Sequence, residues 1–146
     1  MFDLTKYFKA RYPGIAVLTV EQRRARKEII EQGKKAHFEE ILLWSATSGF
    51  EKMKGGGPVR DTEDVSAALK FRSKKTLYIF QDLHLFPLSE NPILNRMLAD
   101  LLEWLPLPCE DENGNTKDGG GGVGLLLLPL RGQAIRVLRG AGRPAR

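Results

Sequence analysis

The chain has 146 residues, of which 42% are hydrophobic and 28% are charged, values typical of one soluble globular domain. A fibrous protein, a largely disordered chain and a disulfide-stapled miniprotein are excluded, because a chain of this length can bury a core without cross-links. The net charge of +5 belongs to the last stretch alone: without its five arginines, 18 basic and 18 acidic residues balance, so the charge does not characterise the body of the protein.

The first predicted elements are a buried strand and a charged helix. Ile15–Val20 is a short, β-branched apolar run, and the strong helix formers that follow it carry only a thin apolar stripe. Thr19 and Gln22 stand at the spacing of a capping box. Gly33 marks either the end of this helix or a looser turn.

A second buried strand is predicted over Ile41–Ala46, followed by a polar loop up to Gly49. The stretch 52–61 contains three glycines in succession and a proline, which oppose both helix and strand. Asp61 or Thr62 then caps a short helix with an acidic first turn.

The clearest strand is Thr76–Asp82, which is rich in β-propensity residues and ends in a carboxylate. Asn91 caps the next helix and Pro92 occupies its first position, and apolar residues recur at helical spacing as far as Leu105. A polar, glycine-rich loop precedes a fourth apolar strand that begins at Val123.

Strands that alternate with helices and carry continuous apolar runs predict an α/β fold, with a parallel sheet between two helical layers. We expect residues 1–130 to form this domain and residues 131–146 to form a basic, flexible tail. The tail holds all five arginines of the charge excess: Arg131, Arg136, Arg139, Arg143 and Arg146.

Cysteine content and hydropathy indicate the compartment. Cys109 is the only cysteine, so no internal disulfide is possible. No stretch approaches the ~18 to 20 apolar residues of a membrane span, and the first residues do not resemble a secretion signal. We expect a cytoplasmic protein that does not bind membranes.

Ligands of open parallel sheets bind beyond the carboxyl ends of the strands. A nucleotide-hydrolysing enzyme would carry G-x-x-x-x-G-K-[ST] after the first strand. This pattern occurs nowhere in the chain, and Glu21 stands where phosphate would approach. The glycine runs Gly55–Pro58 and Gly119–Gly122 lack the lysine and hydroxyl that a phosphate loop needs, so we interpret both as flexible loops.

The candidate binding residues at strand ends are Thr19, Glu21, Asp82 and His84. Asp82 occupies the place of a magnesium-organising acid, but Leu83 follows it, so a role in ordering a loop is favoured. Two histidines and one cysteine are too few for a convincing transition-metal site, and no serine or cysteine has the context of a catalytic nucleophile. We therefore predict no catalytic residue and no metal site.

Aromatic residues indicate core and surface. Trp44 and Trp104 lie within apolar segments and are predicted to be buried. An alternative for Phe80, Leu85 and Phe86 is that they form an exposed patch that contacts a partner.

The order of segments resembles a known family. The residues that carry the resemblance are T-x-E-x-x-R at Thr19–Arg24, WSATSGF at Trp44–Phe50, Ala68-Leu69, QDLHLF at Gln81–Phe86 and Asn95-Arg96. This pattern, over about residues 8–105, is similar to the N-terminal region of the AAA-type ATPases typified by the conserved cyanobacterial and plastid ATPase. The resemblance implies a RecA-like domain that has lost its phosphate loop and precedes an ATPase module with Walker motifs.

Three functions follow as hypotheses. The first is a non-catalytic domain that binds a protein partner or an ATPase module, with ATP and magnesium expected only in such a downstream module. The second is a nucleotide- or metal-dependent phosphoester hydrolase, whose unconventional site would use the four candidate residues. The third is weak, salt-sensitive nucleic-acid binding through the arginine-rich tail.

Overall fold

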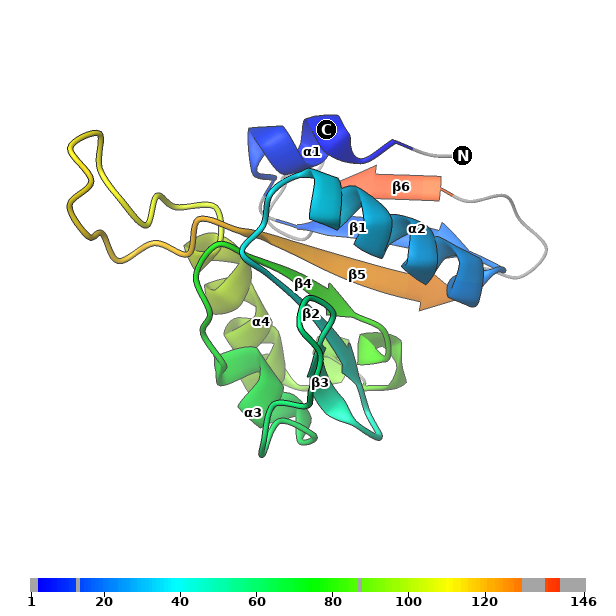
Figure 1. Ribbon diagram of the computed structural model, residues 1–146. Coiled ribbons are helices and arrows are strands. Elements are labelled where there is room, and N and C mark those ends of the chain that lie inside the picture. Colours follow the sequence, from blue (N-terminus) through cyan, green and yellow to red (C-terminus); the bar gives the residue numbers. More distant parts are fainter. Residues whose placement is uncertain (1–2, 13, 87, 130–135, 140–146) are drawn as a thin grey trace.

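A six-stranded sheet in the order β3-β2-β4-β5-β1-β6 runs through the protein (Figure 1). The computed structural model describes residues 3–12, 14–86, 88–129 and 136–139, the last four by their backbone alone. The strands are β1 (Ile15–Thr19), β2 (Glu40–Ser45), β3 (Gly49–Lys52), β4 (Thr76–Phe80), β5 (Val123–Pro129) and β6 (Arg136–Arg139). The helices are α1 (Thr5–Ala10), α2 (Gln22–Lys35), α3 (Val65–Lys70) and α4 (Pro92–Trp104), with short 3₁₀ turns η1 (Leu83–Leu85) and η2 (Leu88–Glu90).

The four central strands are parallel, and the two strands that border them, β3 and β6, are antiparallel to their neighbours. The predicted α/β class with a mostly parallel sheet in three layers is therefore confirmed, and the architecture is that of a RecA-like domain. The sheet also holds two antiparallel strands that the sequence analysis did not predict.

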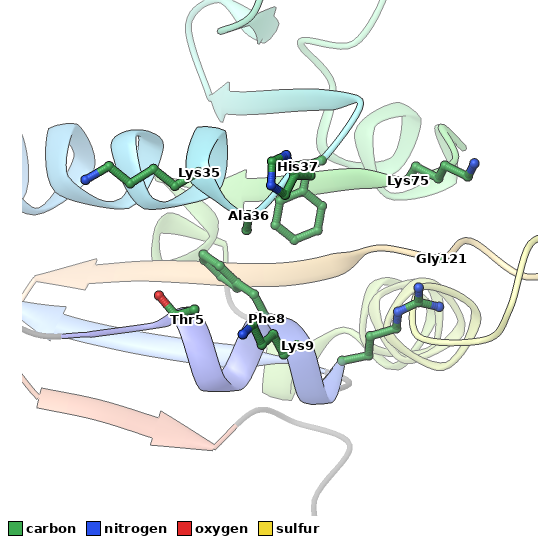
Figure 2. A pocket seen from close by; sticks show the side chains of 10 residues that line it. Thr5, Phe8, Lys9, Lys35, Ala36, His37, Lys75 and Gly121 are labelled. Atoms are coloured by element: carbon green, nitrogen blue, oxygen red, sulfur yellow. The ribbon is translucent and has the colours of Figure 1, made fainter.

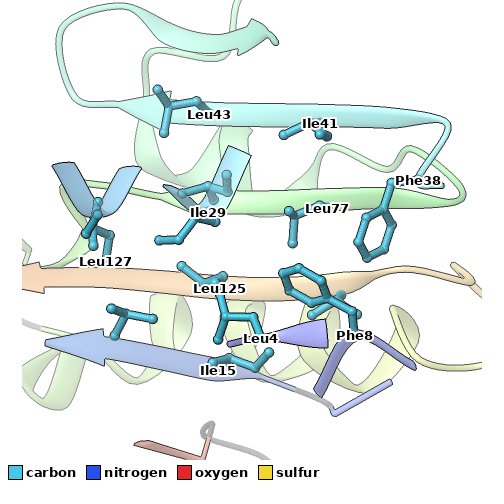
Figure 3. Packing of buried hydrophobic residues seen from close by; sticks show 14 residues of the cluster. Leu4, Phe8, Ile15, Ile29, Phe38, Ile41, Leu43, Leu77, Leu125 and Leu127 are labelled. Carbon is cyan, nitrogen blue, oxygen red and sulfur yellow. The ribbon is translucent and has the colours of Figure 1, made fainter. Parts of the chain in front are cut away.

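Each face of the sheet has its own hydrophobic core. On one face, α1 and α2 pack over the strands, and Figure 3 shows Phe8 and Ile29 together with Leu77 and Leu125 in the buried cluster of this face. On the other face, α3 and α4 cover a cluster that is rich in aromatic rings, with Trp44 and Phe50 fully buried. Both faces of the central strands are thus covered, which explains their continuous apolar runs.

Local signals account for the helix that the sequence predicted best. The Asn91 side chain accepts a hydrogen bond from the Leu94 N–H at 3.1 Å, and Pro92 is the first residue of α4. Leu98, Leu101 and Leu102 are the buried face of this helix. The predicted cap and apolar stripe are confirmed.

Other predicted caps were wrong. α2 begins at Gln22 after Glu21, without a side-chain cap, because the Thr19 hydroxyl accepts from the Glu21 N–H at 3.0 Å. The helix passes through Gly33 and ends at Lys35. α3 is capped by Asp64, whose carboxylate accepts from the Ser66 and Ala67 N–H groups, and not by Asp61 or Thr62.

The predicted loop between the second and third parallel strands is partly wrong, since Gly49–Lys52 form β3, antiparallel to β2. Beyond β3, Gly55, Gly56 and Gly57 have positive φ and face open space, as expected of an exposed turn.

The second glycine run contradicts the interpretation as a flexible loop. Gly119–Gly122 are buried, and their N–H groups donate to four carbonyls at the end of α4, those of Pro108, Trp104, Leu107 and Leu105. A Cβ on Gly122 would lie 2.1 Å from the Thr76 carbonyl oxygen. The run donates hydrogen bonds to carbonyls at and just beyond the end of α4, and only glycine allows so close an approach.

The predicted flexible tail does not describe all of residues 131–146, since Arg136–Arg139 form β6 beside β1. The rest of that segment, and every arginine side chain in it, lies outside the described part of the structure. Among the described helices, none combines the length and the apolar character required to span a bilayer.

Candidate functional site

The carboxyl ends of β1, β4 and β5 enclose a pocket of about 450 Å³, which we call the carboxyl-edge pocket. It forms because Thr19 of β1 pairs in register with Pro129 of β5, and β4 lies on the other side of β5. Its lining is Thr19, Val20, Gln22, Asp82, His84, Leu85 and Pro129. Ligands of open parallel sheets bind at this edge.

Three of the four predicted site residues, Thr19, Asp82 and His84, line this pocket together. The fourth, Glu21, lines an adjoining pocket of about 540 Å³ with Arg23, Arg24 and Lys27. Val20 and Gln22 line both pockets. The four candidate residues predicted from the sequence therefore lie at one edge of the fold. What each side chain can do there depends on the groups that it contacts.

The link between β1 and α2 consists of Val20 and Glu21 alone. A phosphate loop needs about eight residues here, whose backbone amides surround the phosphates, together with a lysine. Thr19 is fully buried, and its hydroxyl accepts from the Glu21 N–H, which tightens the turn. Glu21 itself lies 3.6 Å from Arg24 in an exposed ion pair.

Asp82 joins the ends of two strands. Its Oδ2 accepts a hydrogen bond from the Ala46 N–H at 2.8 Å, directly after β2. The Gln81 N–H donates to the Trp44 carbonyl at 3.0 Å, and the Gln81 side chain accepts from Arg26 at 2.5 Å. Asp82 thus has the loop-ordering contact that the sequence analysis favoured.

His84 and Leu85 lie in η1, directly after Asp82. Leu83, between them and the strand, is buried in the aromatic core, so it fixes the turn. His84 is exposed, and Leu85 is 61% exposed. No group of three histidine, cysteine or acidic side chains in the described ranges could hold a metal ion.

The motif residues of WSATSGF have structural roles. The buried Trp44 indole N–H donates to the Thr62 carbonyl at 2.6 Å, and the Thr62 hydroxyl accepts from the Phe50 N–H and donates to the Val59 carbonyl. Gly49 has φ +70°, and a Cβ there would lie 2.7 Å from the Thr62 Oγ1. The motif therefore fastens the β2–β3 hairpin to the segment before α3.

Of the aromatic predictions, Trp44 is in the core as expected, whereas Trp104 is only partly buried and donates to the Asp118 carbonyl. Phe80 is fully buried, so it belongs to no exposed patch. Val20, Gln22 and Pro129 also line the pocket and lie at the strand ends where the sequence predicts a ligand site, but the sequence did not single them out as candidates. Only the pairing of β5 with β1, which no local pattern announces, brings Pro129 to the site.

Comparison with known proteins identified a family. The sequence model of the family described as "SpoVK-like AAA ATPase, N-terminal domain" matches residues 2–110. No curated protein and no solved structure matched the chain significantly.

Proposed function

Because the chain belongs to the family of SpoVK-like AAA ATPase N-terminal domains, we propose that it is a non-catalytic interaction domain that docks on an AAA-type ATPase module. The observation that carries this proposal is the two-residue link Val20–Glu21 between β1 and α2. In a nucleotide-binding sheet this position would hold the triphosphate.

The surroundings of the link support a site without nucleotide. Glu21 adds a carboxylate where phosphate would approach, and the basic residues that line its pocket, Arg23, Arg24 and Lys27, are exposed on α2. Asp82, the residue placed to organise magnesium, already accepts a hydrogen bond from the Ala46 N–H. Both features favour a structural use of this edge.

The same edge exposes apolar surface. Val20 and Leu85 are 50% and 61% exposed, and both line the carboxyl-edge pocket. Arg23 and Lys27 extend the surface along α2 and have no ion pair within the described chain. Exposed apolar side chains with a basic flank suit a partner surface that offers aliphatic side chains beside carboxylates.

Calorimetry of the full chain with ATP and magnesium tests the absence of a nucleotide site. We expect no heat of binding at millimolar ATP. Micromolar binding that Asp82→Asn abolishes would overturn the proposal, since the carboxyl-edge pocket would then be a working nucleotide site.

Mixing the chain with the ATPase module of a protein of this family tests docking. We expect Leu85→Asp to weaken the complex at least about tenfold, because it places a charge in an apolar contact. Ile93→Asp is the matched control, as Ile93 is 68% exposed on α4 and lies outside both pockets. Equal binding by both variants would exclude this edge as the docking surface.

The hydrolase alternative rests on the meeting of Thr19, Asp82 and His84 in one pocket. Its test is magnesium- or manganese-stimulated cleavage of a phosphoester, with Asp82→Ala as the control.

Nucleic-acid binding through the arginine tail also stays a prediction. It is tested by measuring DNA affinity at low salt with and without residues 131–146.

A further inference from the structure

A third and larger pocket lies at the opposite edge of the sheet. It has a volume of about 620 Å³ and is formed by α1, the end of α2, the segment after it and the start of β4. We call it the amino-edge pocket. Figure 2 shows Ala36 and His37 at the end of α2 facing Phe8 and Lys9 of α1 across it. This volume is within the range of small-molecule sites.

One part of the lining is apolar and aromatic. The rings of Phe8 and Phe38 meet edge to face with centroids 5.3 Å apart, and both residues are buried. They connect the pocket to the core beneath α1. An aromatic or aliphatic body would find contact area here.

The remaining lining is basic. Lys9, Arg11, Lys35 and His37 line the pocket, no carboxylate does, and none of the four has an ion pair within the described residues. Figure 2 shows Lys35 and Lys75 reaching away to either side, so the labelled basic side chains nearest the centre are Lys9 and His37.

Lys75 contributes little net charge. Its ammonium lies 2.5 Å from Glu110 and 3.3 Å from Glu39. These carboxylates raise the pKa of Lys75, with Glu110 the larger cause, and Lys75 in turn lowers the pKa of Glu110. The unpaired cations of the lining are therefore Lys9, Arg11 and Lys35, of which Lys35 reaches away from the pocket, with His37 beside them.

The backbone around this pocket is unusual. Four non-glycine residues of the described chain have positive φ, and three of them line the pocket: Arg11 at 51°, His37 at 65° and Lys75 at 54°. Arg11 and His37 follow the ends of α1 and α2, where glycine is the common residue. The charge of a helix end favours basic side chains there, but it does not require a left-handed backbone. Such strain is concentrated at functional sites.

We propose that the amino-edge pocket binds a small organic anion the size of a nucleoside monophosphate. The anionic group lies against Lys9, Arg11 and His37, and the apolar body lies on Phe8 and Phe38. This site is independent of the docking function at the other edge.

NMR titration of the full ¹⁵N-labelled chain with AMP, adenosine and inorganic phosphate tests the proposal. We expect AMP to bind at least about tenfold more tightly than either fragment, with amide shifts at residues 8–11 and 36–38. We take ~5 mM as the limit of weak small-ligand affinity. If none of the three probes binds at this concentration, the proposal is overturned. Shifts confined to residues 19–22 and 82–85 would also overturn it.

A matched pair of variants tests the charge. Lys9 and Lys70 each lie in the last turn of a six-residue helix, on opposite faces of the sheet. Lys9→Gln should weaken AMP binding about fivefold, whereas Lys70→Gln should not change it. An equal effect of both variants would indicate only a general influence of net charge and would refute the site.

A second pair separates binding from folding. His37→Gly and Asp61→Gly each remove a left-handed non-glycine residue, and Asp61 lies away from the pocket. Both should raise the urea midpoint, because glycine adopts this conformation freely, but only His37→Gly should weaken AMP binding. Unchanged AMP affinity in His37→Gly would contradict the assignment of His37.

Discussion

Replacement of Gly122 by alanine tests whether the glycine run is a packed part of the fold. The added Cβ would lie 2.1 Å from the Thr76 carbonyl oxygen and 2.9 Å from the Thr76 nitrogen. Thr76 is fully buried and begins β4, where it pairs with Glu40 of β2. To reach ordinary contact distance, the backbone of one strand must shift by at least about 1.3 Å, which interiors resist because they are close-packed.

Overpacking of this kind costs about 3 kcal/mol where backbone must move. Gly122→Ala should therefore lower the free energy of unfolding by about 3 kcal/mol, a large part of the ~5 to 15 kcal/mol that holds a domain folded. Gly56→Ala is the comparison. A Cβ on Gly56 meets nothing within 4 Å, and its φ of +71° alone should cost about 1 kcal/mol.

Urea denaturation followed by circular dichroism measures both values, with the slope m as a check that unfolding stays two-state. If Gly122→Ala costs no more than Gly56→Ala, the run is the flexible loop that its composition suggests, and the packing argument fails.

Three further predictions concern single side chains. Tyr78→Phe should lower the free energy of unfolding by about 1 to 3 kcal/mol in the same urea assay, because it removes the hydroxyl that accepts from the Ser73 N–H and donates to the Phe71 carbonyl. An unchanged urea midpoint would show that water replaces this hydroxyl. Asn91→Ala should cost about 1 kcal/mol through loss of the α4 cap, and a loss of helical signal should accompany it. The Ser66 hydroxyl, with neighbouring N–H groups, lowers the pKa of Asp64. The stability that Asp64 gives is therefore complete above the unfolded carboxyl pKa of about 3.9 and is lost as the pH falls below it. The difference in urea midpoint between the wild type and Asp64→Asn should accordingly narrow from pH 7 to pH 3.

Apolar runs and helix caps in the sequence predicted the elements that depend on nearby residues alone. Apolar runs predicted the four parallel strands, and Asn91 followed by Pro92 predicted the start of α4. β3 was missed because it has only four residues and follows a turn whose sequence resembles a loop. Its stability comes from pairing with β2 and from Thr62, which lies outside the hairpin.

The glycine run and the amino-edge pocket could not be predicted because each depends on contacts between segments that are separated in the sequence. The partners of Gly119–Gly122 are carbonyls that precede the run in the chain and were not identifiable as such. The amino-edge pocket combines residues 5–11, 35–38, 75 and 121, which share no motif. The carboxyl-edge pocket was easier to find, since strand ends of a parallel sheet are recognisable in the sequence.

The position of β1 has a consequence for synthesis. β1 is the first of the described strands to be synthesised, yet Ile15 pairs with Leu125 of β5 and Arg139 of β6, which are the last two of them. β2, β3 and β4 can pair with one another much earlier. Until β5 and β6 have been synthesised, an apolar segment therefore waits with both hydrogen-bonding edges open, and chaperones that hold nascent chains would find their target there.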